Sequence, residues 1–196
     1  MLNKLLHRSA YMCRQIKLTL LISVVSIVVY ITPFNIQEVL VYNRTSILFG
    51  QIWRLTTGHF LHCDFGHLMW NLVAFLFIAG ALEYDMSSYT FSKIILLGGA
   101  LLSAGLLLLK PSLQLYCGLS GILNMMLVLL LDKQYRSTRQ KIYPFIFTLA
   151  IGKVVFEYFS TTALFTSTSW ESISEAHLLG LGIGIVYSIT RHRYGN

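Results

Sequence analysis

Six apolar segments constrain the fold of this chain more than any other feature. Charges, prolines or polar clusters bound each of them, and they cover roughly residues 18–32, 65–82, 94–109, 118–131, 142–159 and 176–190. All fall short of the roughly 20 residues of a simple membrane span. Flanking polar residues or local thinning of the bilayer would make up the difference. The pattern predicts an all-α membrane protein, a bundle of six transmembrane helices.

The composition also favours the lipid bilayer as the environment of the chain. Apolar residues make up 55% of it and charged residues 12%, with a mean hydropathy of +0.64, whereas a soluble domain carries about 25% charged residues. The net charge of +7 could indicate nucleic acid, but the basic residues lie at the ends of apolar segments. We therefore expect no nucleic-acid partner. The first segment lacks a small-residue cleavage site after it, so it reads as a transmembrane helix and not as a signal peptide.

The positions of lysine and arginine predict the orientation. Eleven of the 15 basic residues lie in segment 1–17, near residue 93, in loop 132–141 and in tail 191–196. Basic residues prefer the cytoplasmic side, so we expect both termini in the cytoplasm. A basic tail (1–17) would precede a six-helix core (18–190), and a second basic tail (191–196) would follow it.

Polar side chains from three predicted helices fall at one depth under this topology. Ser120 begins the fourth segment, His177 begins the sixth, and His67 and Asn71 share one face of the second at i, i+4 spacing. All lie within roughly 9 Å of the outer end at 1.5 Å per residue. Polar groups at membrane depth are rare and usually functional.

These residue types suit nucleophilic hydrolysis. His177 could take the proton of Ser120, and His67, Asn71 and the backbone around Gly118 could stabilise an oxyanion. Gly180 and Gly184 form a small-xxx-small face that would bring the sixth helix against the fourth. No acidic residue is clearly placed to orient the histidine, so a Ser–His dyad is expected, with no metal or cofactor.

The chain resembles the rhomboid intramembrane serine proteases over nearly its whole length. The matching motifs are Trp53-Arg54, His67-x-x-x-Asn71, Gly118-Leu119-Ser120-Gly121 and Ala176-His177-x-x-Gly180-x-x-x-Gly184. The resemblance implies Ser120 as nucleophile, His177 as general base, and His67 with Asn71 as oxyanion donors. It also implies transmembrane proteins as substrates.

Other features look like the rhombosortase branch of that family. Asn124 stands where many rhomboids carry a tyrosine, and the remaining features are the segment 58–62, Lys153-x-x-x-Glu157 and Glu175-Ala176-His177. The branch implies substrates with a C-terminal sorting tail, made of a Gly-rich motif, a hydrophobic helix and a basic cluster. It also implies a bacterial inner membrane, with the site open to the periplasm. Whether water or an amine resolves the acyl-enzyme is left open.

Lys153 and Glu157 lie four residues apart within the fifth apolar segment and share a helix face. Counted from the cytoplasmic end, they are about 16 and 22 Å up the helix, near the level of the serine. Two interpretations stay open. In the first, the two charges pair only to offset the cost of their own burial. In the second, the pair faces the cavity and recognises substrate or hydrogen-bonds near the dyad.

Three other functions compete with the protease. A zinc site could use a histidine-rich cluster, although HExxH and paired CxxC are missing; its members are His59, His62, Cys63, Asp64 and His67. A transporter could use the polar residues, but no internal repeat is found. A silent rhomboid-like protein that binds helices would be expected to lack the serine or histidine. The three cysteines cannot all pair, so no disulfide framework is expected, and Cys117 reads as a small buried apolar residue.

Overall fold

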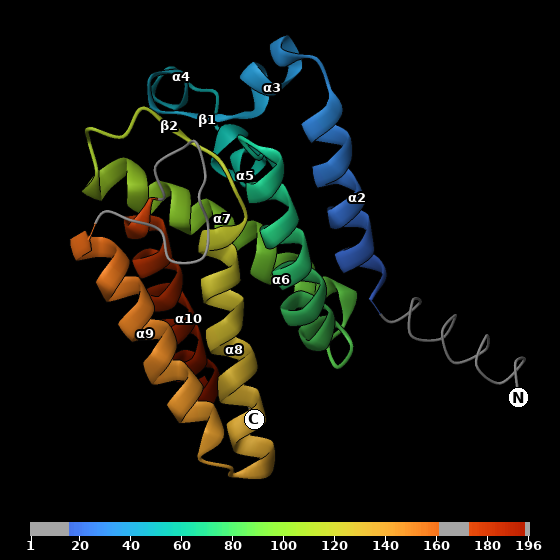
Figure 1. The fold of residues 1–196 in the computed structure, drawn as a ribbon, viewed down its shortest axis with the longest axis vertical. Coiled ribbons are helices and arrows are strands. Elements are labelled where there is room, and N and C mark those ends of the chain that lie inside the picture. The colour runs from blue at the N-terminus through green and yellow to red at the C-terminus, as the bar shows by residue number, and fades with distance from the viewer. Residues whose placement is uncertain (1–15, 161–172, 195–196) are drawn as a thin grey trace, which may run out of the picture.

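Six long helices form the protein in the computed structural model, which describes residues 16–160 and 173–194 (Figure 1). They are α2 (Lys17–Ile31), α6 (Phe65–Glu83), α7 (Ser88–Leu109), α8 (Ser120–Thr138), α9 (Ile142–Ser160) and α10 (Ser174–Tyr194). Each coincides with one predicted apolar segment, although α8 and α10 run further into the basic ends than residues 131 and 190. The expected N-terminal tail lies almost wholly outside the described residues.

Three of these helices, α6, α7 and α9, are long and apolar enough to cross a membrane by length and composition. Helix α2 is apolar but has only 15 residues, and α8 and α10 carry charged residues in their terminal turns. Large apolar side chains such as Phe77, Leu108 and Phe159 are largely exposed on the outside of the bundle. Such a surface suits lipid and not water. The count of six spans stays a prediction.

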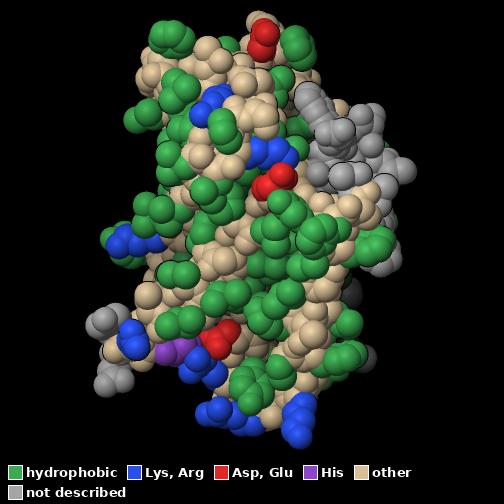
Figure 2. Space-filling view, turned by 90° about the vertical axis from the view of Figure 1, so that its left-hand side faces the viewer, with side chains coloured by type: hydrophobic (Ala, Val, Ile, Leu, Met, Phe, Trp, Pro, Cys, Tyr) green, Lys and Arg blue, Asp and Glu red, His purple; other side chains and the backbone are tan. Residues whose placement is uncertain are grey.

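The two ends of the bundle differ in charge. Helix α10 ends toward the lower end of Figure 1, where the turn between α8 and α9 also lies. Lysine and arginine side chains gather at this end in the space-filling view, below a broad hydrophobic region (Figure 2). Basic side chains at one end of the bundle are what the positive-inside rule leads us to expect. The cytoplasmic placement of both termini remains a prediction.

A compact irregular segment covers the opposite end, between α2 and α6 (Figure 1). It consists of α3 (Phe34–Leu40), β1 (Tyr42–Asn43), α4 (Arg44–Leu48), α5 (Arg54–Thr57) and the 3₁₀ turn η1 (Gly58–Phe60). Strand β1 pairs antiparallel with β2 (Leu115–Tyr116), the strand that leads into α8. The irregular segment is thereby joined to the start of α8.

Arg54 holds this segment together from a buried position. Its guanidinium donates through Nη1 to the carbonyls of Glu38 and Val41, both at 2.7 Å, and through Nε to Gln51 Oε1 at 2.7 Å. The neighbouring Trp53 indole donates to the Val39 carbonyl at 3.1 Å. The Trp-Arg pair therefore ties α5 to the end of α3, since the bonds to Glu38, Val39 and Val41 satisfy carbonyls that the end of the short helix leaves free.

Helices α8 and α10 approach so closely that their backbones touch. A Cβ built on Gly180 would lie 2.1 Å from the Gly121 carbonyl oxygen, and one on Gly184 would lie 2.8 Å from the Met125 oxygen. Only glycine fits at such distances, which confirms the predicted small-residue face. The main apolar core lies beside this contact, between α6, α7 and α8; it includes Phe75, Leu82, Ile95, Ile122 and Met126.

A buried carboxylate joins α2 to the far end of α6. Glu83 is 1% exposed and accepts bonds from the Leu18 and Thr19 amides and from the Thr19 hydroxyl, at 2.8 to 2.9 Å. The first amides of a helix have no partner within the helix. Glu83 therefore caps α2 from a distant part of the chain and fixes where it packs.

The glycine contact predicts a position-specific cost. Gly180→Ala should destabilise the protein by about 1–3 kcal/mol, because the new methyl group meets backbone that cannot rotate away. Gly182→Ala is the matched control on the same helix, since its Cβ would meet nothing within 4 Å. Thermal unfolding of both variants in detergent measures the difference. Equal stability of the two variants would contradict the packing described above.

The α2 cap predicts a second stability effect. Glu83→Gln places an amide N–H₂ where a carboxylate oxygen now accepts, so we expect a loss of about 2 kcal/mol from the charge-assisted bonds. The control is Asp85→Asn at the same end of α6, where a half-exposed carboxylate pairs with Lys133. That change should cost under about 1 kcal/mol. Denaturant unfolding of both variants tests the cap, which is refuted if Glu83→Gln is no less stable than Asp85→Asn.

Candidate active site

Ser120 is the first residue of α8, directly after a turn that only glycine makes easily. Gly118 has φ +116°, in the left-handed region, and a Cβ there would lie 2.6 Å from both Cε1 and Nε2 of His67. The imidazole of His67 therefore rests against the Gly118 backbone. Ser120 is half-buried and lies at a helix N-terminus, where free amides and the helix dipole favour negative charge.

His67 and Asn71 lie on the first turns of α6, as predicted. Asp64 caps this helix, because its Oδ1 accepts the His67 amide at 2.7 Å. The Asn71 side chain is buried and donates through Nδ2 to the His67 carbonyl at 2.9 Å. One amide hydrogen of Asn71 is thus used within its own helix, which orients the side chain one turn below His67.

His177 lies on the first turn of α10, on the side of the helix that contacts α8. A Cβ on Gly121 would lie 3.1 Å from the carbonyl oxygen of Ala176, so the residues after Ser120 and before His177 are in contact. His177 is buried and also close enough to His67 for an electrostatic interaction. The structure therefore brings His67, Gly118, Ser120 and His177 to one end of the bundle, from three different helices.

A carboxylate of the Lys153–Glu157 pair reaches His177, as one of the two interpretations of that pair allowed. Glu157 Oε2 on α9 lies 3.3 Å from His177 Nδ1, while Glu157 Oε1 accepts from Lys153 Nζ at 2.7 Å. The acid nearest in sequence, Glu175, is paired instead with Lys110 at 2.5 Å. The expectation that no acidic residue is placed beside the histidine was therefore wrong, because α9 crosses α10 at this level.

Two more polar groups surround the serine. The Tyr116 hydroxyl donates to the Gly118 carbonyl at 3.1 Å and lies beside the Ser120 side chain. Burial raises the pKa of the Tyr116 phenol, so it remains a hydrogen-bond donor. Asn124 donates to the Ser120 carbonyl at 2.9 Å, one turn along α8. No sequence motif pointed to Tyr116, since its place depends on the pairing of β2 with β1.

A disulfide joins the residues that precede α6 and α8. Cys63 and Cys117 are bonded, 54 residues apart in sequence, with their Cα atoms 6.8 Å apart. The expectation of no disulfide was wrong, and so was the interpretation of Cys117 as a buried apolar residue. Three cysteines leave one over but do not prevent two from pairing. The bond holds the start of α6 beside the turn at Gly118.

The histidine-rich cluster does not assemble as a set of zinc ligands among the described residues. His59 Nε2 contacts the Gly99 carbonyl at 2.9 Å and the Ser103 hydroxyl at 3.0 Å. His62 packs edge-on against His67, and burial, followed by the neighbouring His67, lowers the pKa of His62 to about 3. Cys63, His67 and Cys117 do lie together, but the disulfide uses both thiols that would bind a metal.

Comparison with known proteins shows the family of the chain. The sequence model of the Rhomboid domain family matches residues 49–194, which include the irregular segment from α5 onward and helices α6 to α10. No curated protein matched the chain. Since the matched region covers well over half of the 196 residues, the chain is an integral membrane protein that belongs to the rhomboid family.

Proposed function

We propose that this protein is an intramembrane serine endopeptidase in which Ser120 is the nucleophile and His177 the general base. The observation that carries the proposal is the direct contact of α8 and α10 between Gly121 and the Ala176–Gly180 turn. A serine hydroxyl needs a nearby base to become nucleophilic. The contact puts the first turns of these helices, one bearing the serine and the other the histidine, side by side.

Transition-state stabilisation is assigned to the groups around Gly118. A tetrahedral intermediate places negative charge on the former carbonyl oxygen, which preorganised donors stabilise. His67 lies on the Gly118 backbone, the first amides of α8 are free of intrahelical partners, and Asn71 lies one turn below. The proton of Ser120 passes to His177 as the bond from the serine oxygen to the scissile carbonyl forms. His177 then returns the proton to the leaving amine.

The site is proposed to open on the outer, periplasmic side of a bacterial inner membrane. Disulfides form in oxidising compartments and are rare in the cytosol, and Cys63–Cys117 lies at the end of the bundle that carries Ser120. The opposite end carries the basic side chains (Figure 2). The disulfide and the position of the basic side chains are independent observations, and both favour the same orientation.

The proposed substrates are membrane-anchored proteins cleaved near that face. The sequence features of the rhombosortase branch narrow them to proteins with a C-terminal sorting tail. Asn124 supports this assignment in part, because it fills the position of the family tyrosine and bonds to the Ser120 carbonyl. A fusion protein ending in a Gly-rich motif, a hydrophobic helix and a basic cluster is therefore the appropriate test substrate.

Removal of either reacting group should abolish the activity. Ser120→Ala and His177→Ala should each eliminate cleavage of the fusion protein, and the double variant should be no worse than either, because the two residues act as one unit. Labelling by a fluorophosphonate probe should be lost in Ser120→Ala. Gly182→Ala, which alters an open position of α10, should retain both signals. Substantial cleavage by Ser120→Ala would exclude the serine mechanism.

Loss of one oxyanion donor should slow turnover without preventing binding. His67→Ala and Asn71→Ala should each lower kcat by roughly 10- to 1000-fold with a smaller effect on KM.

EDTA should leave the activity of the parent protein unchanged, since no step of the proposed mechanism uses a metal. A loss of activity in EDTA that zinc restores would instead support a metal site at the histidine-rich cluster.

A further inference from the structure

A mechanism that uses only Ser120 and His177 gives no role to the contact between Glu157 and His177. Glu157 is 3% exposed on α9, and its two carboxylate oxygens face different partners. Oε1 accepts from Lys153 Nζ at 2.7 Å, and Oε2 lies 3.3 Å from His177 Nδ1. The carboxylate thus stands between a lysine on its own helix and the proposed base on the next helix.

The chemistry of imidazole determines which atom donates the hydrogen in this contact. An ionised carboxylate only accepts hydrogen bonds, so it selects the tautomer of His177 in which Nδ1 carries the hydrogen. Nε2 then holds the lone pair, which is the form that can take a proton from Ser120. The same contact restrains rotation of the ring and stabilises the imidazolium that forms when the serine proton has moved.

Lys153 offsets the free-energy cost of burying the Glu157 carboxylate at this depth. A single buried charge is strongly destabilising, whereas a paired one is tolerated. Lys153 lies four residues earlier on the same face of α9, and its side chain is 37% exposed. It can keep contact with the polar edge of the bilayer while it neutralises Glu157. Because it occupies Oε1, the ring of His177 meets Oε2.

We propose that Glu157 positions His177 for catalysis, and that Lys153 in turn holds Glu157, so that the site is a Ser120–His177–Glu157 triad. This inference rests on the proposed function, because it assigns Glu157 a task only if His177 is the base. Glu157 takes no proton in the reaction. The serine proton moves to His177 Nε2, and the hydrogen on Nδ1 stays between the ring and the carboxylate.

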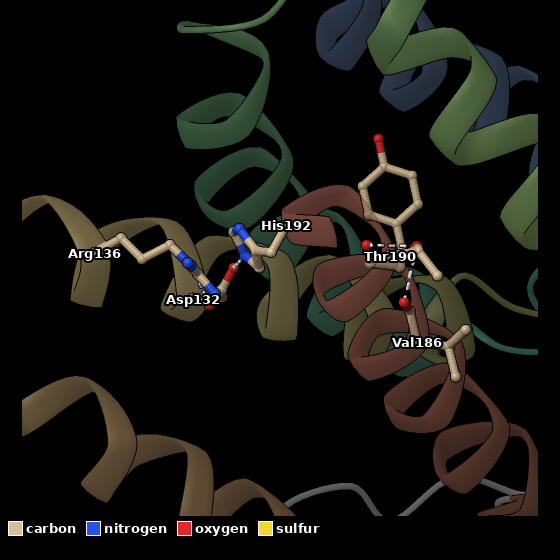
Figure 3. A network of polar contacts seen from close by, with 6 residues as sticks. Asp132, Arg136, Val186, Thr190 and His192 are labelled. Carbon is tan, nitrogen blue, oxygen red and sulfur yellow. Dashed lines mark hydrogen bonds and ion pairs between the residues drawn. The ribbon is translucent and has the colours of Figure 1, made fainter. Parts of the chain in front are cut away.

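The same arrangement occurs a second time in the chain, away from the serine, and provides a matched control. Asp132 on α8 contacts His192 Nε2 on α10 at 2.9 Å through one oxygen and Arg136 Nε at 2.9 Å through the other (Figure 3). It too is a carboxylate between a histidine of α10 and a cation four residues away. It lies about 18 Å along α8 from Ser120.

The experiment compares Glu157→Gln with Asp132→Asn in the purified full-length protein. The rate of fluorophosphonate labelling is measured over a range of probe concentrations, which separates the limiting rate from the half-saturating concentration. We expect Glu157→Gln to lower the limiting rate on the order of 100-fold or more at an unchanged half-saturating concentration. The glutamine amide can donate to Nδ1 and so favours the wrong tautomer. Asp132→Asn should label at the parental rate.

Glu157→Asp tests rescue by the conservative change. It keeps the charge but withdraws the carboxylate by one methylene, so it should label faster than Glu157→Gln and more slowly than the parent. If Glu157→Gln unfolds, as thermal unfolding would show, Glu157→Asp decides alone, and labelling at the parental rate overturns the proposal.

The remaining outcomes separate the two proposals. A folded Glu157→Gln that labels within twofold of the parent overturns the positioning role while the serine mechanism stands. A parent that labels no more than Ser120→Ala overturns the proposed function and the triad together.

Discussion

The direct backbone contact between α8 and α10 is the constraint on which the rest of the structure depends. A methyl group at Gly180 would overlap the Gly121 carbonyl, so any larger residue would separate the helices that carry Ser120 and His177. Proton transfer between those side chains requires hydrogen-bond distance. The other elements can be understood as supports of this contact: α6 brings His67 to one side of it, and α9 brings Glu157 to the other.

Three buried polar side chains are paired across elements, and these pairs help to decide how the elements pack. Glu83 caps α2 from α6, Arg54 bonds to the end of α3 from α5, and Glu157 bridges α9 and α10. In a lipid environment no driving force comes from burying apolar side chains against one another, because the lipid is equally apolar. Paired polar groups and close glycine contacts are then the interactions that can select one arrangement.

Sequence periodicity and charge were sufficient for the helices, because each helix is a local property of its apolar segment. The Ser120, His177 and His67 positions followed from helix starts and spacing. The α8–α10 glycine contact also followed from the sequence, but most other contacts between distant segments did not. For Glu157, the level on its helix left a hydrogen bond near the dyad as one of two interpretations, without naming His177 as the partner. Cys63 and Cys117 are 54 residues apart, and nothing in the local pattern shows that they meet. Tyr116 was missed for the same reason, because a two-residue strand pairing places it.

The disulfide and the glycine turn together explain how side chains from separate helices can be held in one arrangement. A functional site must keep its groups within roughly 0.5 Å of the productive geometry, and the first turn of a helix is the part that frays most easily. Cys63–Cys117 links the residues before both α6 and α8, and His67 rests on Gly118 in the same place. The first turns that carry His67 and Ser120 are therefore fixed to each other covalently, while His177 is fixed from the other side by Glu157.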